Sequence, residues 1–370
     1  MDLISLDEFL LDYPQISLAR KKDNEDILEF YRKLEMENSN QSIKYDRTPN
    51  FFKFLEYSYG EYFVLLLKNK KNEIAGIGTV IKRKLHLNGV LEDVCYLGDL
   101  RVNSLRYTIL WRSFYAEFIK KMTSIKEFSS VKVNYTVVLA ENLKAMKALS
   151  SHKNKFYYHL KANYKMVNII APSFLVKQSH QVEMFEFSDM ENQFLEREMN
   201  NHYLMISQEE LRFRFANFYD EKRLYKVLKD GEIVAVFGLW SPQDSKTIEI
   251  GHLSSLIRWF YNFSKIGFRA PELNKKLKPL YLNNLIFKED MDVKERSLIL
   301  SSIIRYTFHS NKMDHYHFLT IADFEDESLY DGYKWCYHQT VGAKLFEVSK
   351  VQEGLIHDSS SYLSLDLSLI

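Results

Sequence analysis

Two groups of titratable side chains in this sequence could take part in proton transfer. Carboxylates surround one predicted strand over residues 90–103 and follow another in the second half of the chain: Glu92, Asp93, Asp99, Glu289 and Asp290. Near the C-terminus, four side chains recur at a spacing that predicts one helix: Tyr330, Tyr333, Tyr337 and His338. Carboxylates can act as general bases, and tyrosine or histidine as general acids. Acid–base chemistry is therefore available, although such tyrosine spacing is also typical of core packing.

Other constellations of residues do not complete a site. His315 and His317 share a strand face with His309 nearby, but no cysteine or carboxylate spacing turns them into a known metal site. The basic clusters at 82–84 and 274–278 are typical of a solvated surface and do not indicate nucleic-acid binding. Hydrolase, nucleotide-binding and zinc-protease motifs are absent. We therefore expect no metal and no membrane or nucleic-acid partner.

Composition limits the class of protein further. With 370 residues, 46% of them apolar, the chain is long enough for two domains. Fifty Lys and Arg residues against 49 Asp and Glu residues leave a net charge of +1, which favours no charged macromolecule as a partner. Cys95 and Cys336 are the only cysteines, and this indicates a reducing compartment. Because the acidic start carries no basic leader and no apolar run could cross a bilayer, we expect a cytoplasmic protein.

Hydrophobic periodicity predicts the elements that must position these residues. In the first half it gives the order βααβββαβαβ(β): strand 16–21, helices 24–37 and 50–59, a hairpin over 61–89, strand 90–103, helix 108–122, strand 131–140, helix 141–151 and one or two strands within 155–171. The segment 171–181 then loses periodicity and contains a proline. We therefore predict two domains, 1–174 and 175–370.

The same order begins again in the second domain. Its predicted elements are strand 181–187, helices 190–201 and 207–219, a hairpin over 223–240, strand 279–290, helix 295–310, strand 315–323 and a helix and strand within 328–349. This alignment makes Tyr96 and Leu282 equivalent. The segment 254–278 has no counterpart in the first domain, and its Trp259, Tyr261 and Phe263 are candidates for an acceptor pocket.

This repeated order resembles the GNAT superfamily of acyl-CoA N-acyltransferases over nearly all of both halves. The resemblance implies a mixed α/β fold of two tandem domains, each with a central twisted sheet flanked by helices. It also implies transfer of an acyl group, acetyl in the first instance, from an acyl-CoA to the amine of a small molecule or peptide. In that family the central strand splays from its neighbour to bind the pantetheine arm, and the next helix start holds the pyrophosphate.

The resemblance assigns cofactor-binding positions in both halves. Those in the first half are Leu100, Arg101 and Val102 on the central strand, Arg106, Tyr107 and Thr108 at the next helix start, and Asn142 at a later one. Those in the second half are Ile286, Phe287, Arg296 and Ser297. Both loops lack the family's glycines, since Ile109 and Trp111 stand in their place in the first. Arg106 and Arg296 are candidates either for phosphate contact or for a salt bridge.

The family's tyrosine acid falls at Leu149 in the first half, but at Tyr337 or His338 in the second, which makes the second half the better catalytic candidate. Asp99 and Glu92 are the candidate bases. Tandem domains of this type also resemble Fem-type aminoacyl-tRNA-dependent transferases. A third possibility is a non-catalytic protein that binds a ligand or partner, which Trp111 projecting into the cleft would favour. The oligomeric state is left open.

Overall fold

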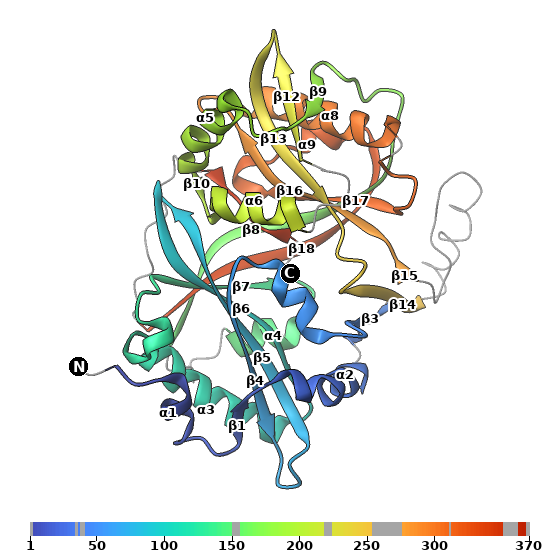
Figure 1. The fold of residues 1–370 in the computed structure, drawn as a ribbon. Helices are drawn as coiled ribbons and strands as arrows, with labels where there is room; N and C mark the ends of the chain where they lie inside the picture. Colours follow the sequence, from blue (N-terminus) through green and yellow to red (C-terminus); the bar gives the residue numbers. More distant parts are fainter. Residues whose placement is uncertain are drawn as a thin grey trace.

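The computed structural model describes residues 3–33, 36–37, 41–149, 156–217, 224–253, 276–310, 312–350 and 362–367. The predicted acceptor segment, with Trp259, Tyr261 and Phe263, lies largely outside these residues, as does the side chain of Leu149. Figure 1 shows two lobes of similar build, joined through the strands at the centre of the molecule.

The first half contains the predicted elements and a few short additions. In order they are α1 (Leu6–Leu10), β1 (Ile16–Leu18), η1 (Lys21–Asp23), α2 (Asn24–Lys33), β2 (Met36–Glu37), β3 (Gln41–Asp46), η2 (Phe51–Tyr57), β4 (Gly60–Lys68), β5 (Ile74–Leu87), β6 (Val90–Val102), α3 (Leu105–Lys121), η3 (Met122–Ser124), η4 (Lys126–Phe128), β7 (Val133–Leu139), α4 (Leu143–Leu149) and β8 (Tyr157–Pro172).

The second half repeats this plan. In order its elements are β9 (Gln181–Met184), α5 (Asp189–Glu198), η5 (Met199–Asn201), β10 (His202–Tyr203), β11 (Met205–Ile206), α6 (Gln208–Asn217), β12 (Leu224–Lys229), β13 (Glu232–Trp240), β14 (Thr247–Leu253), β15 (Lys276–Leu277), β16 (Pro279–Phe287), α8 (Val293–His309), β17 (Phe318–Phe324), η6 (Glu325–Glu327), α9 (Tyr330–Tyr333), β18 (Cys336–Ser349) and β19 (Tyr362–Leu363). The predicted hairpin turns at Asp230 and Gly231, which both have positive φ.

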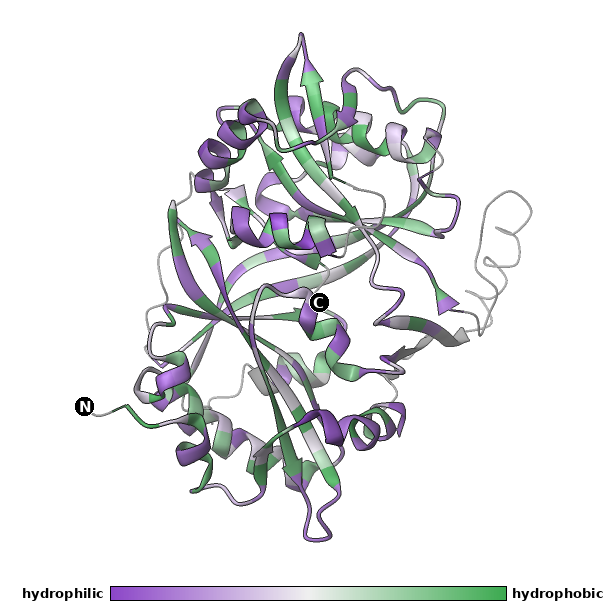
Figure 2. Cartoon of the chain, viewed as in Figure 1, coloured by the Kyte–Doolittle hydropathy of each residue, from purple (hydrophilic) through white to green (hydrophobic). Residues whose placement is uncertain are grey.

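One mixed sheet runs through both halves. Its strand order is β1-β4-β5-β6-β7-β18-β8-β17-β16-β13-β12-β9, with β11 added against β5. Helices flank this sheet, as the mixed α/β prediction requires (Figure 1). In Figure 2 apolar residues are concentrated along strands within each lobe such as β5 and β13, most of whose residues are buried, and polar residues on outer helices such as α2 and α5.

The two halves exchange their closing strands. The last long strand of the chain, β18, pairs with β7 of the first half and with β8 along its whole length. The strand β8 belongs to the first half in sequence, yet it also pairs with β17 of the second. Each half therefore completes its part of the sheet with a strand from the other.

Each half has a central pair of parallel strands that diverge. The ladder between β6 and β7 runs from Val94 to Tyr96, and that between β16 and β17 from Pro279 to Tyr281. Tyr96 thus corresponds to Tyr281, one residue before the predicted Leu282. Just beyond the ladders, Asp99 and Asn284 both have φ of 53°, next to register shifts against β5 and β13. The two halves therefore repeat the same bulge.

The tyrosine-rich segment near the C-terminus is not one helix, and the sequence prediction was wrong here. The helix α9 covers only Tyr330–Tyr333, and Tyr337 and His338 lie in β18. Because β18 pairs with strands on both sides, its tertiary hydrogen bonding overrides the helical spacing of the aromatic residues.

Trp111 lies in the core and not in a cleft. It is 3% exposed and packs in the apolar layer beneath α3 with Phe114 and Phe118. A Cβ atom at Gly78 would lie 2.5 Å from the Trp111 ring, so β5 needs glycine where the indole crosses it. The bulky residue that replaces a family glycine therefore packs against the sheet.

The exchanged strands predict how the two halves behave when they are expressed as separate fragments. A piece covering 1–174 lacks β18 beside β7, and a piece covering 175–370 lacks β8 beside β17, so each exposes a long unpaired strand edge. We expect each piece alone to aggregate or stay unfolded, and the two co-expressed pieces to associate. Gel filtration and circular dichroism would measure this. A single piece that is monomeric and melts cooperatively would contradict it.

Candidate functional site

In the first half the ladder between β6 and β7 is short, and we call the opening between the two strands beyond it the cleft of the first half. The ladder ends at Tyr96 and Tyr135, and the Thr136 hydroxyl donates to the Leu97 carbonyl at 2.7 Å just beyond it. Further along β6, Leu100 is 54% exposed, and Arg101 and Val102 are half-buried. Leu100, Arg101 and Val102, the predicted cofactor-binding residues of this strand, therefore lie beside this cleft. Their backbone groups on that side are not paired with β7.

The start of α3 stands at the end of this cleft. Its N-cap, Ser104, makes no side-chain hydrogen bond to the helix, and the first turn contains no acidic residue. Arg106 is exposed in that turn, followed by the half-buried Tyr107 and Thr108. Free backbone N–H groups at a helix start, together with the helix dipole, favour an anion. The predicted phosphate positions of the first half thus keep the features that phosphate binding needs.

The start of α8, at the equivalent place in the second half, has the opposite character. Asp292 caps the helix by accepting from the Glu295 N–H at 2.7 Å, and Glu295 adds a second carboxylate to the first turn. Arg296 is buried, pairs with Glu327 at 2.9 Å and lies over the Tyr362 ring. Arg296 therefore makes a salt bridge here, and its role toward a phosphate stays a prediction. Ser297 beside it is buried.

A cavity lies where β16 leaves β17, but the chain itself fills part of this second cleft. Its apolar walls include Phe287, a predicted cofactor-binding residue, together with Leu282 and Ile321. The C-terminal segment borders the cavity, since β19 pairs in parallel with β10 and the Ser364 N–H donates to the Tyr203 carbonyl. Ile286 is fully buried in the core.

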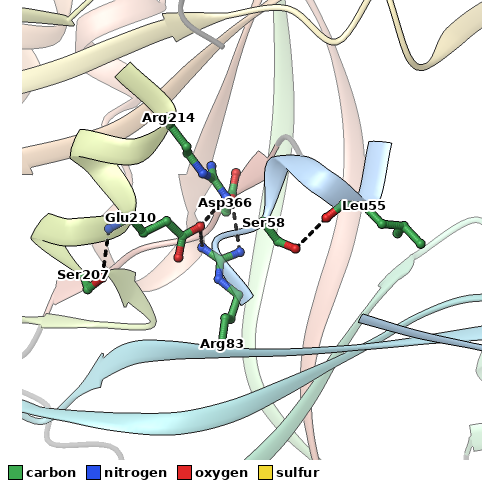
Figure 3. A network of polar contacts seen from close by, with 7 residues as sticks. All are labelled: Leu55, Ser58, Arg83, Ser207, Glu210, Arg214 and Asp366. Atoms are coloured by element: carbon green, nitrogen blue, oxygen red, sulfur yellow. Dashed lines mark hydrogen bonds and ion pairs between the residues drawn. The ribbon is translucent and has the colours of Figure 1, made fainter. Parts of the chain in front are cut away.

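A buried ionic network holds the C-terminal segment between the halves (Figure 3). Asp366 accepts from Arg83 of β5 at 3.1 Å and from Arg214 of α6 at 2.6 Å. Glu210 pairs with the same two arginines, at 2.9 and 2.6 Å. The two arginines and two carboxylates neutralise each other, because buried charges are stable only when they are paired with opposite charges. The network therefore ties the last described residues to both halves.

Among the predicted catalytic residues, Asp99 is the one that lies among other polar and charged side chains. At the bulge of β6 it accepts hydrogen bonds of 2.8 Å from both the Tyr31 hydroxyl and Arg47. Burial alone raises the pKa of a carboxyl, but Arg47, then Arg101, and the Tyr31 hydrogen bond outweigh it, so the pKa of Asp99 lies below its ordinary value. Asp99 is thus held as an anion, which makes it a weak base.

Further groups complete this cluster, which we call the Asp99 cluster. Arg47 is 4% exposed and lies over the Phe54 ring at 4.3 Å, while Arg101 lies over the Tyr31 ring at 4.1 Å. Lys246, from the second half, is 8% exposed and interacts electrostatically with Asp99 and Arg47. The sequence predicted only Asp99 and Arg101 among these residues.

The remaining predicted catalytic residues and Asn142 are not part of the Asp99 cluster. Glu92 is near the start of β6, opposite Leu85. The Asn142 side chain accepts from the Ala145 N–H and so caps α4. In the second half, Tyr337 is 52% exposed on β18, and the His338 ring contacts the Cys336 carbonyl at 2.8 Å.

Comparison with known proteins identifies the fold. No family model and no curated protein matches the chain. Two solved structures of Saccharomyces cerevisiae N-myristoyltransferase with bound myristoyl-CoA are similar, with TM-scores of 0.53 and 0.57, 11% and 13% identity, and coverage of 91% and 90% of this chain and 83% and 79% of those chains. The chain therefore has a GNAT-type fold with two tandem domains.

A third solved structure is a GCN5-related glucosamine N-acetyltransferase region in a fungal multi-domain GH3 β-N-acetylglucosaminidase. Its TM-score is 0.57 at 12% identity, with 90% of this chain and 38% of that chain covered. In the described parts of the chain, no helix is long and apolar enough to cross a membrane. The described residues also contain no group of three or more His, Cys, Asp or Glu that could hold a metal ion.

The network in Figure 3 predicts that Asp366 matters for stability. Replacing Asp366 with Asn leaves Arg83 and Arg214 with a single carboxylate in a buried place, and we expect the free energy of unfolding to fall by about 3–5 kcal/mol. Asp331→Asn is the matched control, because Asp331 pairs with Lys334 at the surface and should change stability by less than about 1 kcal/mol. Urea unfolding measures both. Equal effects would refute the role of the network.

Proposed function

We propose that this protein transfers an acyl group from an acyl-CoA to an amine, and that the acyl-CoA binds in the cleft of the first half. The observation that carries the proposal is the contrast between the two helix starts. That of α3 has no carboxylate and presents Arg106, whereas that of α8 is occupied by Asp292 and Glu295. A pyrophosphate is attracted to the first, whereas at the second Asp292 already accepts from a backbone N–H and Glu295 pairs with Lys229.

The diverging strands support the same choice. Leu100, Arg101 and Val102 would offer backbone groups to the pantetheine arm, and Arg106, Tyr107 and Thr108 would hold the pyrophosphate. Asn142 lies at the start of α4 and would approach the cofactor from the side of β7. The solved structures with the same fold contain myristoyl-CoA or belong to an N-acetyltransferase region, which supports an acyl-CoA as the donor.

We take acetyl as the first acyl group to test and the amine of a small molecule or peptide as the acceptor. A closed, non-catalytic cleft is less well supported, since the Trp111 ring packs in the core and does not fill the cleft. Transfer from aminoacyl-tRNA remains the alternative donor. The catalytic roles of Tyr337 and His338 and the cofactor roles of Ile286, Phe287, Arg296 and Ser297 stay predictions, as does the cytoplasmic location.

Calorimetric titration with CoA and with acetyl-, octanoyl- and myristoyl-CoA tests the proposal. We expect micromolar binding that Arg106→Ala weakens about tenfold, which corresponds to about 1.4 kcal/mol for one lost phosphate contact. The matched control is Lys294→Ala, because Lys294 is an exposed cation in the first turn of α8 and should have no effect. Transfer to amines is then assayed with the acyl-CoA that binds best.

Either of two results would overturn the proposal. Weakening by Lys294→Ala but not by Arg106→Ala would move the cofactor to the second half. Failure of every acyl-CoA to bind the wild-type protein would remove the acyl-CoA donor and favour aminoacyl-tRNA, which the same titration can test directly.

A further inference from the structure

The turn before β14 brings a residue of the second half into the cleft of the first. It is a tight turn, since the Ser245 and Lys246 N–H groups both donate to the Pro242 carbonyl, at 2.9 and 2.7 Å. Its Asp244 accepts from the Tyr57 hydroxyl and pairs with Lys53 at 2.7 Å. The strand β14 then continues antiparallel to β3 of the first half. The turn is therefore fixed to the first half on both sides of Lys246.

Lys246 enters the Asp99 cluster from this turn. Its ammonium lies 5.0 Å from the centre of the Phe54 ring, which Arg47 also contacts. The charged groups that act on it are Arg47, which follows β3, and Asp99 and Arg101 of β6. The Tyr31 hydroxyl of α2 completes the set through its hydrogen bond to Asp99. Arg47 thus pairs with Asp99, and both Arg101 and Lys246 act electrostatically on the same carboxylate.

We propose that Lys246 is the general base of the first half's site, supplied by the second half to take the proton from the attacking amine. This inference rests on the proposed acyl transfer. It follows from the position of Lys246, which lies 5.0 Å from the Phe54 ring and interacts electrostatically with Asp99 at the bulge of β6. Its burial keeps bulk water from competing for the proton.

The electrostatics of the cluster suit Lys246 and not Asp99 for this role. Burial and then Arg47 lower the pKa of Lys246 to about 7, against a smaller opposing effect of Asp99. A base whose pKa lies near the working pH is the most effective, and Lys246 meets this condition. Asp99 has a lowered pKa and accepts from Tyr31 and Arg47, so its place is to hold the cluster together.

The reaction balances with Lys246 as the only proton acceptor. The neutral amine attacks the thioester carbon and forms the C–N bond, while the nitrogen gives one proton to Lys246 Nζ. The C–S bond then breaks with its electron pair on sulfur. The Lys246 ammonium then gives this proton to the CoA thiolate, so that amide and free thiol are the products and Lys246 is again neutral.

The pH dependence of the transfer rate tests this assignment. In the wild type, kcat/KM is expected to rise with pH through about 7, because Lys246 becomes active as it loses its proton. Lys246→Met should lose about 10²–10⁴-fold in kcat, with unchanged acyl-CoA binding by calorimetry. Lys246→Arg keeps the positive charge and should be equally inactive at every pH. Lys177→Met is the control and should behave as wild type, because Lys177 is exposed and belongs neither to the turn nor to the Asp99 cluster.

The outcomes separate this inference from the proposed function. A Lys246→Met protein that binds acyl-CoA and keeps wild-type transfer with the same pH profile overturns the base but leaves acyl transfer intact. Absence of transfer and of acyl-CoA binding in the wild type overturns both. If Lys246→Met does not fold, ¹³C-lysine NMR of the wild type, assigned with Lys246→Arg, decides: a Lys246 signal that titrates near 10.5 contradicts the assignment.

Discussion

The antiparallel pairing of β18 with β8 is the constraint on which the rest of the structure depends. It runs from Cys336 opposite Pro172 to Ser349 opposite Tyr157 and joins the two parts of one sheet. Since β7 and β17 find their next partners only in these two strands, neither half can satisfy its backbone hydrogen bonds alone. The halves are thereby held in one fixed relation, and a side chain from one can be placed accurately in the cleft of the other.

Within this frame, the two halves have diverged in charge more than in shape. Both keep the diverging parallel strands and the bulge, at Asp99 and at Asn284. The first half keeps a helix start free of carboxylates, whereas the second has a carboxylate cap at Asp292 and a cleft bordered by the chain's own C-terminal segment. We infer that one cleft kept a cofactor site while the other became a structural support.

Local patterns made much of this fold predictable. Helical and strand periodicity located α2, α3, α8 and the hairpin at Asp230, and their order gave the fold class. The exchange of β8 and β18 left no local signal, because it depends on pairing between residues about 180 positions apart. Tyr337 and His338 were predicted in a helix, and not in a strand, for that reason. Asp99 could be found as a carboxylate on the central strand, but Arg47 and Lys246 meet it only through tertiary contacts.

A crystal structure with a non-hydrolysable thioether analogue of acetyl-CoA tests the central claim most directly. The account predicts the pantetheine arm between β6 and β7, the pyrophosphate at the start of α3 beside Arg106, and the acyl carbon near the bulge at Asp99, within reach of Lys246. An analogue bound between β16 and β17 at the start of α8 would contradict the account.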